Sequence, residues 1–457
     1  MVTLTNDTTS TPEPNASGRP DLASSTSVNL GSLLAAIAEE LSRRSDPAAK
    51  AALADGVAEV GRAIGRSWAW QPGSAQQNWT ANGAAADWTT TDWSRNDWTT
   101  DDWTTEDWTT TDWTEREPAT HQSTPSYERQ LTMFAIREAK PGAQWKGLLD
   151  ATWPAYRAWY LSEGETRRPK INVCADMLAK HMPELMPTWK KMVELGGGDE
   201  LLARFLTGWD LPQFAPGCSQ AVLTGERPIL VRNYDYNADL WERVVLSTQF
   251  SDHKVIGTSD CLWGLLDGMN DAGLMVSLAF GGRPGSGEGF AVPMVVRYVL
   301  ETCATVQQAK DKLDGIPMAM AYNLTIADAH GETITAYVAP DAAPEYRPLP
   351  AATNHRGQTP EYPDHARQLR SVERHELLLQ SIDEGIDREE LADSFMAEPL
   401  RAENFTGGFG TLYTAIYRPD QKSVEYRWPD SALIRTFDES SAQADFVLRS
   451  TDSADVA

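Results

Sequence analysis

The stretch Pro216-Gly217-Cys218-Ser219-Gln220, with Val231-Arg232-Asn233-Tyr234-Asp235-Tyr236 shortly after it, decides how the rest of the chain is interpreted. Residues 221–223 and 228–234 are rich in β-branched and apolar residues and flank a Thr-Gly-Glu-Arg turn, so they predict a β-hairpin. Such a hairpin returns an arginine and an aspartate to the neighbourhood of the cysteine. We therefore expect Cys218 to be a nucleophile that becomes a chain N-terminus by cleavage after Gly217.

The chemistry of a cysteine nucleophile explains why a cut at this point is useful. A cysteine attacks as its thiolate, so a neighbouring group has to accept the thiol proton. The α-amino group that cleavage frees on Cys218, with an ordinary pKa of about 8, can be that base without a histidine. The site then needs a group that orients the amine, donors for the oxyanion, and a cationic or polar surround.

Composition limits the partners and the compartment. The 457 residues carry a net charge of −25, which argues against nucleic acid or an anionic membrane as a partner. The four cysteines, Cys174, Cys218, Cys261 and Cys303, lie far apart and lack zinc-site spacing, so no metal is expected. Residues 1–20 lack the basic and apolar regions of a secretory signal, and no run approaches the about 18 apolar residues of a membrane helix. We expect a cytoplasmic protein with reduced thiols.

The first 125 residues do not resemble an enzyme domain. Residues 1–27 have the composition of a disordered segment. Residues 28–70 predict a helical hairpin, from helical spacing of apolar residues and from the Asp46-Pro47 start signal. We interpret this hairpin as a docking or dimerising element, with a recognition segment for a partner enzyme as the alternative. Residues 71–125 hold a repeat followed by a Pro/Ser/Thr linker.

The repeat places a tryptophan at every fifth position from Trp88 to Trp113, each after an aspartate, in the unit Asp-Trp-Thr-Thr-x. A period of five matches neither a helix face nor strand alternation, so it gives no apolar stripe to bury. Three interpretations stay open. The repeat is a solvated linker that makes weak multivalent contacts with a peptide or protein partner, a series of peptide units that this chain or a neighbour modifies or cuts, or a ligand-binding or assembly element.

The remaining sequence divides at the cysteine. Residues 126–217 predict a helical small subunit or pro-segment, with helices at 127–138, 154–161, 171–195 and 199–209. Residues 218–436 are strand-rich, with helices at 293–303, 306–313 and 364–382 and later hairpins at 322–338 and 410–428. Strand hairpins that are interrupted by two groups of helices favour a layered αββα sandwich. Residues 437–457 predict a loose acidic tail.

Several short motifs follow one another in the strand-rich part. They are Gly-Cys-Ser at 217–219, Arg-Asn-Tyr-Asp at 232–235, Gly-Met-Asn-Asp-Ala-Gly-Leu at 268–274, Tyr-Asn-Leu at 322–324, Asp-Ala-His-Gly at 328–331 and Thr-Asn-His at 353–355. In this order they resemble the acyl-coenzyme A:6-aminopenicillanic acid acyltransferase family, which are N-terminal nucleophile hydrolases of the peptidase C45 type, related to the bile-salt (choloylglycine) and penicillin V amidases. The resemblance extends from about residue 127 to 428 and implies a four-layer αββα fold.

The resemblance also implies roles for individual residues. Cys218 matches the nucleophile that autoproteolysis frees at the Gly217–Cys218 bond. Arg232 and Asp235 match the pair that orients the amine and steadies the thiolate. Asn270 matches the oxyanion donor.

Two further positions complete the implied site. Asn323 matches a second polar contact at the nucleophile. Arg374 matches a later arginine near the site, with Arg370 competing for that role. The serine after the cysteine departs mildly from the threonine that is common in the family, and it keeps the hydroxyl.

The same residues allow other interpretations. Taken singly, Asp235 and Asn270 are typical turn-forming residues, and Arg232 is typical of a surface cation. Asn354-His355 suggests a papain-like Cys-His-Asn scheme as an alternative to the amine base. The other three cysteines are expected to be core residues. The glycine-rich run at 281–289 lacks a following Lys-Ser/Thr and predicts a mobile pocket loop rather than a phosphate site.

Together these patterns predict an enzyme without a metal or cofactor. Cys218 would attack the acyl carbonyl of a linear amide, and the thioester would pass its acyl group to water or to another amine, with acyl-coenzyme A as a further acyl donor. Two alternatives stay open: a peptide precursor fused to its processing enzyme, with the tryptophan repeat as substrate, and a non-catalytic scaffold that uses the repeat for binding.

Overall fold

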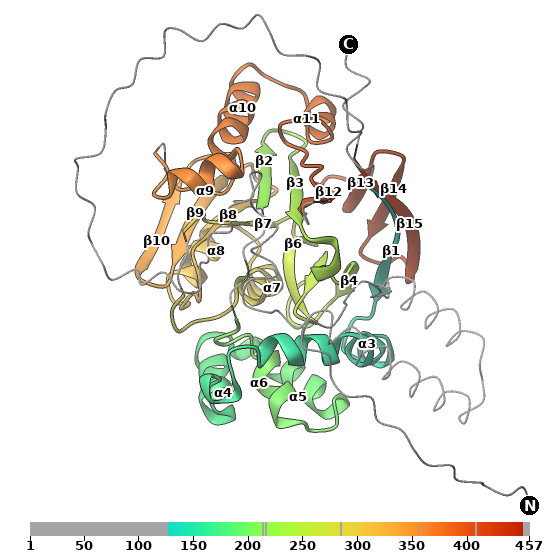
Figure 1. Cartoon of the computed structure of the whole chain (residues 1–457), viewed down its shortest axis with the longest axis vertical. Coiled ribbons are helices and arrows are strands. Elements are labelled where there is room, and N and C mark those ends of the chain that lie inside the picture. The colour runs from blue at the N-terminus through green and yellow to red at the C-terminus, as the bar shows by residue number, and fades with distance from the viewer. Residues whose placement is uncertain are drawn as a thin grey trace, which may run out of the picture.

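A computed structural model of the chain describes residues 127–450, except residues 213, 215–216, 284–285, 358 and 407–408. The predictions for residues 1–27, 28–70 and 71–125 lie outside the described residues. Two β-sheets and the helices that flank them make up the fold (Figure 1).

The larger sheet has nine strands and is antiparallel except where β1 runs parallel to β4. Its order is β10 (Ala342–Arg347), β9 (Thr333–Ala339), β8 (Tyr322–Ala327), β7 (Met275–Phe280), β6 (Gly264–Asn270), β5 (Val255–Asp260), β4 (Val244–Thr248), β1 (Glu128–Arg137) and β15 (Ala442–Arg449).

The smaller sheet has six antiparallel strands and contains Cys218. Its order is β11 (Ala351–Ala352), β2 (Gly217–Leu223), β3 (Ile229–Tyr236), β12 (Gly410–Arg418), β13 (Ser423–Trp428) and β14 (Ser431–Thr436). The predicted β2–β3 hairpin is present, and the late hairpin is β12–β13.

The α-helices of the described residues form three groups. They are α3 (Ala143–Tyr160), α4 (Ile171–His181), α5 (Met186–Leu195) and α6 (Glu200–Leu206) before the cysteine, α7 (Val292–Thr302) and α8 (Val306–Leu313) after β7, and α9 (Pro363–Gln368), α10 (Ser371–Asp383) and α11 (Arg388–Ser394) after β11. Short 3₁₀ turns lie at Glu165–Arg167, Pro183–Leu185 and Ala238–Leu240. None of these helices is both long enough and apolar enough to cross a membrane.

Side-chain alternation shows that the two sheets pack face to face between helices. In β6, Asp267 reaches Arg232 of β3, whereas a Cβ on the adjacent Gly268 would lie 2.8 Å from Leu300 Cδ1 of α7. In β3, Asn233 points away from the larger sheet and donates to two carbonyl groups that follow α11. The order of layers is therefore α7, nine-stranded sheet, six-stranded sheet, and α10 with α11, which confirms the predicted αββα sandwich.

The helices α3–α6 gather at one end of the sandwich (Figure 1). They dock on the turn between β5 and β6 through two indole groups. Trp145 Nε1 donates to the carbonyl oxygen of Leu262 at 3.1 Å, and Trp263 Nε1 donates to that of Leu206 at 3.0 Å. Helices are therefore present in the predicted helical block, but the helix predicted at 154–161 begins at residue 143, and the one predicted at 171–195 is two helices, α4 and α5.

The predicted helix at 127–138 is wrong, because these residues form strand β1. Five consecutive residues, 131–135, are buried, which a surface helix with one apolar stripe does not show. The strand lies between β4 and β15, so both of its edges are paired. A strand covered on both faces shows no alternation in its sequence, and this run of Leu, Met, Phe and Ile was misread as helical for that reason.

The predicted loose tail is wrong for residues 442–449. They form β15, which pairs antiparallel with β1 from Glu128 opposite Arg449 to Ala135 opposite Ala442. Phe446 and Leu448 are buried in the core. The partner strand lies about 300 residues earlier in the chain, so the local sequence gave no sign of the pairing. Residues before and after the predicted cleavage site therefore share one sheet.

Candidate active site

Strand alternation divides the residues around Cys218 between the two faces of the smaller sheet. In the pair β2–β3, Cys218 lies opposite Tyr234, and Gln220 lies opposite Arg232. Opposed residues and residues two apart share a face, so these four side chains point between the sheets. Asp235 points to the other face, toward α10. The fold thus places a cation on the side of the thiol and a carboxylate on the opposite side of the strand.

The thiol of Cys218 is fully buried and contacts Arg232 directly. Nη2 of Arg232 donates to Sγ at 3.3 Å and to the carbonyl oxygen of Leu278 at 3.1 Å. The guanidinium also lies 4.8 Å over the ring of Tyr234. Burial raises the pKa of the Cys218 thiol above its ordinary value, and the positive charge of Arg232 opposes that rise.

The backbone of Cys218 is held by a second pair of side chains. Its N–H donates to Oδ1 of Asn354 at 3.1 Å, and its carbonyl oxygen accepts from Nη1 of Arg374 at 2.7 Å. Arg374 also donates to Asn354 Oδ1 at 2.9 Å and to Ser219 Oγ at 2.6 Å. Asn354 Nδ2 donates in turn to the carbonyl oxygen of Phe280 at 3.0 Å. Both ends of the cysteine backbone are therefore fixed by buried polar groups.

Asp235 reaches this arrangement through Arg374. Its carboxylate lies 3.7 Å from Nη1 of Arg374 and accepts from Thr411 Oγ1 at 2.6 Å. Within the described part of the chain, Asp235 makes no hydrogen bond to Cys218. Burial raises the pKa of Asp235, and the charge of Arg374 opposes the rise. Asp235 thus balances the charge of the arginine that holds the Cys218 backbone.

Gly217 lies where a larger residue does not fit. A Cβ at this position would lie 2.4 Å from Cζ of the Phe409 ring and 3.2 Å from Cβ of Asp235. The space beside the Gly217 backbone is therefore already filled by an aromatic ring and by Cβ of Asp235. This close approach gives a physical reason for glycine before the cysteine.

Asn270 makes the hydrogen bonds of a turn residue. Its Nδ2 donates to the carbonyl oxygens of Leu300 and Cys303, at 2.9 and 2.6 Å. Its Oδ1 accepts from the backbone N–H of Ala272 and of Leu274. Both N–H groups that an oxyanion donor would need are engaged, so these contacts do not support the role that the resemblance implies for Asn270.

Asn323 acts on the site through a neighbouring segment. Its Nδ2 donates to the carbonyl oxygens of Thr353 and His355, at 2.8 and 2.9 Å. These two residues flank Asn354, so Asn323 anchors the segment that carries the acceptor of the Cys218 N–H. Its own carbonyl oxygen accepts from Gln220 Nε2 of β2 at 3.0 Å.

The structure separates the two arginines that competed for one role. Arg374 is buried against Cys218, as described above. Arg370 is exposed, begins α10 in a left-handed conformation with φ of 50°, and pairs with Glu373 and Glu398 on the surface. Arg374 is therefore the arginine that the fold brings to the site.

His355 does not form the papain-like arrangement. Its Nδ1 lies 2.7 Å from Ser371 Oγ and 3.2 Å from Thr353 Oγ1, and it makes no hydrogen bond to Cys218 in the described region. Burial lowers the pKa of His355 to about 4, so the ring is neutral at pH 7. The other cysteines, Cys174, Cys261 and Cys303, are buried and unpaired by disulfides, which confirms that they are core residues.

Asn354 is the site residue that the sequence interpretation missed. It lies inside the Thr-Asn-His motif, but it was considered only as part of the papain-like alternative. In the structure it continues β11, which pairs with β2, and so arrives beside Cys218. The Thr-Asn-His motif was the only signal in the sequence for Asn354. The direction of the Asn354 side chain depends on a strand pairing across more than 130 residues.

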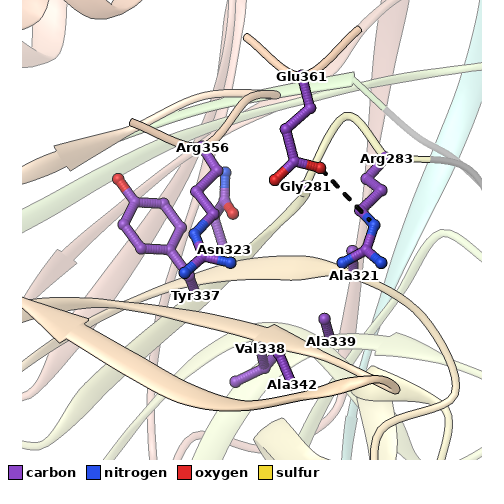
Figure 2. Close-up of a pocket in the computed structure, with 10 residues that line it drawn as sticks. All are labelled: Gly281, Arg283, Ala321, Asn323, Tyr337, Val338, Ala339, Ala342, Arg356 and Glu361. Atoms are coloured by element: carbon purple, nitrogen blue, oxygen red, sulfur yellow. Dashed lines mark ion pairs between the residues drawn. The ribbon is translucent and has the colours of Figure 1, made fainter. Parts of the chain in front are cut away.

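A small polar depression borders the site (Figure 2). Its wall includes Gly281, and the adjacent Gly282 packs so closely that a Cβ there would lie 2.1 Å from the carbonyl oxygen of Asn354. Figure 2 shows Arg283 and Glu361 at its rim, with Nε and Oε2 3.7 Å apart. The lining residues are Gly281, Arg283, Ala321, Asn323, Tyr337, Val338, Ala339, Ala342, Arg356 and Glu361. Each rim arginine has a carboxylate partner, which leaves no unbalanced positive charge in this depression.

The chain has distant similarity to several solved structures. No curated protein sequence matches the chain. Among solved structures, a conjugated bile acid hydrolase from Clostridium perfringens is 13% identical with a TM-score of 0.36, over 50% of this chain and 96% of that one. Penicillin V acylase from Agrobacterium tumefaciens is 15% identical with a TM-score of 0.33, over 48% of this chain and 84% of that one. The Caenorhabditis elegans ortholog of N-acylethanolamine-hydrolyzing acid amidase is 17% identical with a TM-score of 0.34, over 48% of this chain and 100% of that one.

A family model gives the more specific assignment. It covers residues 222–433, which include Arg232, Asp235, Asn323, Asn354 and Arg374, and it begins four positions after the cysteine. The match agrees with the motifs read from the sequence and with the αββα sandwich. Residues 222–433 therefore match the model of the acyl-coenzyme A:6-aminopenicillanic acid acyl-transferase family.

Proposed function

We propose that the chain is an autoprocessed cysteine amidohydrolase or acyltransferase, with Cys218 as its nucleophile. The observation that carries this proposal is the 3.3 Å contact between Arg232 Nη2 and Cys218 Sγ, in a residue whose N–H is held by Asn354. A thiol beside a cation, on a residue whose nitrogen already has an acceptor, suits a nucleophile that is freed as an N-terminus.

Maturation needs only groups of the chain and one water molecule. Sγ of Cys218 attacks the carbonyl carbon of Gly217, the C–N bond breaks as the S–C bond forms, and the thiol proton passes to the departing nitrogen. The product is a thioester of Gly217 with a free amino group on Cys218. Water then cleaves the thioester and leaves the Gly217 carboxylate and the free thiol. Asn354 Oδ1 remains as an acceptor for the new amine.

The mature site then repeats the same chemistry on a substrate. The α-amino group takes the thiol proton while Sγ attacks the acyl carbonyl, and it returns that proton to the amine that leaves. Water or a second amine releases the acyl group from the thioester. The acyl donor in this proposal is a linear amide, or acyl-coenzyme A in the transfer reaction, and the compartment is the cytoplasm. Hydrolysis and transfer differ only in the acceptor.

Two features of the uncut chain support a zymogen interpretation: the thiol of Cys218 is fully buried, and Phe214, shortly before the bond, is held in place by aromatic contacts. The ring of Phe214 lies 6.3 Å from that of Trp159 and 6.1 Å from that of Tyr322, centroid to centroid. Tyr322 Oη donates to the carbonyl oxygen of Phe214 at 3.1 Å. With Cys218 fully buried in this state, a substrate reaches the sulfur only after the groups around it move.

Intact-mass analysis of the wild type beside Cys218→Ala tests the proposal. We expect two fragments from the wild type, the larger beginning at Cys218, and one intact chain from the variant. The matured protein is then assayed with linear amides, and with acyl-coenzyme A plus an amine. An intact wild-type chain would remove the basis of the proposal, and a cut chain that never forms an acyl-thioester would reduce it to a scaffold.

A further inference from the structure

A fully buried aspartate holds the other end of the arginine that touches the thiol. Oδ2 of Asp267 pairs with Nη1 of Arg232 and accepts from the hydroxyl of Tyr413 at 2.6 Å. Its Oδ1 accepts from Thr258 Oγ1 at 3.0 Å and from the hydroxyl of Tyr417. Four donors therefore converge on one carboxylate, which fixes its position.

The guanidinium of Arg232 divides its two amino groups between this carboxylate and the thiol. Nη1 donates to Asp267 and, at 2.7 Å, to the hydroxyl of Tyr413, whereas Nη2 donates to Cys218 Sγ and to the carbonyl oxygen of Leu278. A guanidinium is a rigid planar fork, so fixing one amino group sets the direction of the other. Because Asp267 is in β6 and Arg232 in β3, the orientation of the guanidinium depends on how the two sheets pack.

We infer that Asp267 is a positioning residue for the reaction at Cys218: it aims the Arg232 guanidinium at the sulfur and offsets much of its positive charge. The inference rests on the proposed function and deepens it. Because Arg232 is paired, the sulfur meets a hydrogen-bond donor rather than an isolated cation, and the thiol keeps its proton in the resting state. This arrangement explains why an amine base is still needed to form the thiolate.

The charged groups around Cys218, on both faces of the smaller sheet, come in two balanced pairs. The groups are Arg232 and Asp235 of β3, Asp267 of β6, Arg374 of α10, and the phenols of Tyr234, Tyr322 and Tyr413. The tyrosines are neutral because burial raises their pKa values. Arg374 is balanced by Asp235 and Arg232 by Asp267. Removing the charge of Asp267 alone therefore leaves one unbalanced cation beside the sulfur.

Two substitutions make opposite predictions for the thiol. Asp267→Asn removes a negative charge behind Arg232 and is expected to lower the pKa of the Cys218 thiol by about one unit or more. Tyr417→Phe removes a donor from Asp267 without touching Arg232 or Cys218, so the potential at the sulfur becomes more negative. That change is expected to raise the thiol pKa by a few tenths of a unit, roughly.

Two measurements read the thiol directly. The ¹³Cβ shift of labelled cysteine is titrated in each uncut protein, with the Cys218 signal identified by its loss in Cys218→Ala. In matured protein, the rate of alkylation by iodoacetamide is followed against pH, and mass spectrometry locates the label at Cys218. Glu301→Gln is the matched control, because Arg297 and Glu301 form another fully buried ion pair and neither touches the thiol.

The outcomes separate a positioning role from a structural one. A lower thiol pKa in Asp267→Asn, a higher one in Tyr417→Phe and no change in Glu301→Gln support the inference. An unchanged thiol pKa in all three, with only a loss of stability, overturns it and leaves Asp267 as a clamp between the sheets. If Asp267→Asn does not fold, the direction of the Tyr417→Phe shift decides. If the wild type is never cut, the proposed function fails, while the titration of uncut protein still tests Asp267.

Discussion

The backbone N–H of Cys218 donates to Oδ1 of Asn354 at 3.1 Å, across 136 positions of sequence. This bond holds the nitrogen of the peptide bond that maturation would break. The same Oδ1 accepts from Arg374, so the nitrogen, the amide and the arginine form one connected group. The bond is therefore the place to test whether the site is built for cleavage.

Asn354→Ala should slow cleavage of the Gly217–Cys218 bond by about 10²- to 10³-fold, because the nitrogen loses its acceptor and Arg374 loses a partner. A time course of intact mass after purification of freshly synthesised protein measures the rate. Asn270→Ala is the matched control. It should lower the free energy of unfolding by about 1–3 kcal/mol, since buried turn partners lose their hydrogen bonds, yet leave the cleavage rate nearly unchanged. Equal slowing in both variants would contradict the assignment and restore a direct role for Asn270.

Gly217→Ala should leave the chain largely uncut, because the added Cβ meets the Phe409 ring at 2.4 Å and displaces the carbonyl that Cys218 attacks. Removing the ring should relieve much of this effect. The double variant Gly217→Ala/Phe409→Ala is therefore expected to regain the cleavage that Gly217→Ala lacks. Gel densitometry of the two fragments gives the cut fraction. Efficient cleavage in the single variant would show that the close approach of the ring is irrelevant.

His355 should affect stability against pH rather than catalysis. Its pKa is about 4 in the fold, against about 6.5 in an unfolded chain, so the unfolded chain binds more protons between these values. Stability from this residue is fully present above pH 6.5 and is lost as pH falls toward 4, by about 1–3 kcal/mol. Glu242, whose pKa burial raises to about 7, contributes the opposite slope. The difference in denaturation midpoints between wild type and His355→Asn isolates the histidine.

That variant should still cut itself and keep its activity near pH 7. A His355→Asn protein that is folded but fails to cut would support the papain-like scheme instead.

The two fragments should remain together after cleavage, because β1 stays hydrogen-bonded between β4 and β15. They are expected to co-elute in native size-exclusion chromatography and to separate in denaturant. Phe446→Ala removes a buried ring stacked on Trp428, 4.1 Å between centroids, and should lower the free energy of unfolding by about 3–5 kcal/mol. Ile434→Ala, at a residue that is 59% exposed, is the control and should change it by less than about 0.5 kcal/mol. Fragments that separate under native conditions would contradict the shared sheet.

The sequence predicted the features whose signals are local. The β2–β3 hairpin follows from its turn and its β-branched residues, and α7 follows from its helical spacing. Strand β1 was missed because a strand buried on both faces has no alternating pattern. Strand β15 was missed because its partner is distant in sequence, and short polar segments are ambiguous without a partner.

Around Cys218, too, only positions with a local signal could be placed from the sequence. Arg232 could be placed near the thiol, because a hairpin of known register fixes which residues face each other. Asn354 and Asp267 reach the site through strand pairing and sheet packing that no local pattern encodes. The role of Asn270 stays a prediction, because a turn asparagine and an oxyanion donor look alike in a motif.

The position of β1 has a consequence for everything that precedes it in the chain. A cut at Gly217 would release the nucleophile without releasing residues 1–126, since these residues continue directly into a strand that is built into the enzyme. The Asp-Trp-Thr-Thr units would therefore be tethered to the mature catalytic body rather than shed as a leader. Whatever those units bind or become would meet the site at an effective concentration set by the tether, independent of how dilute the protein is.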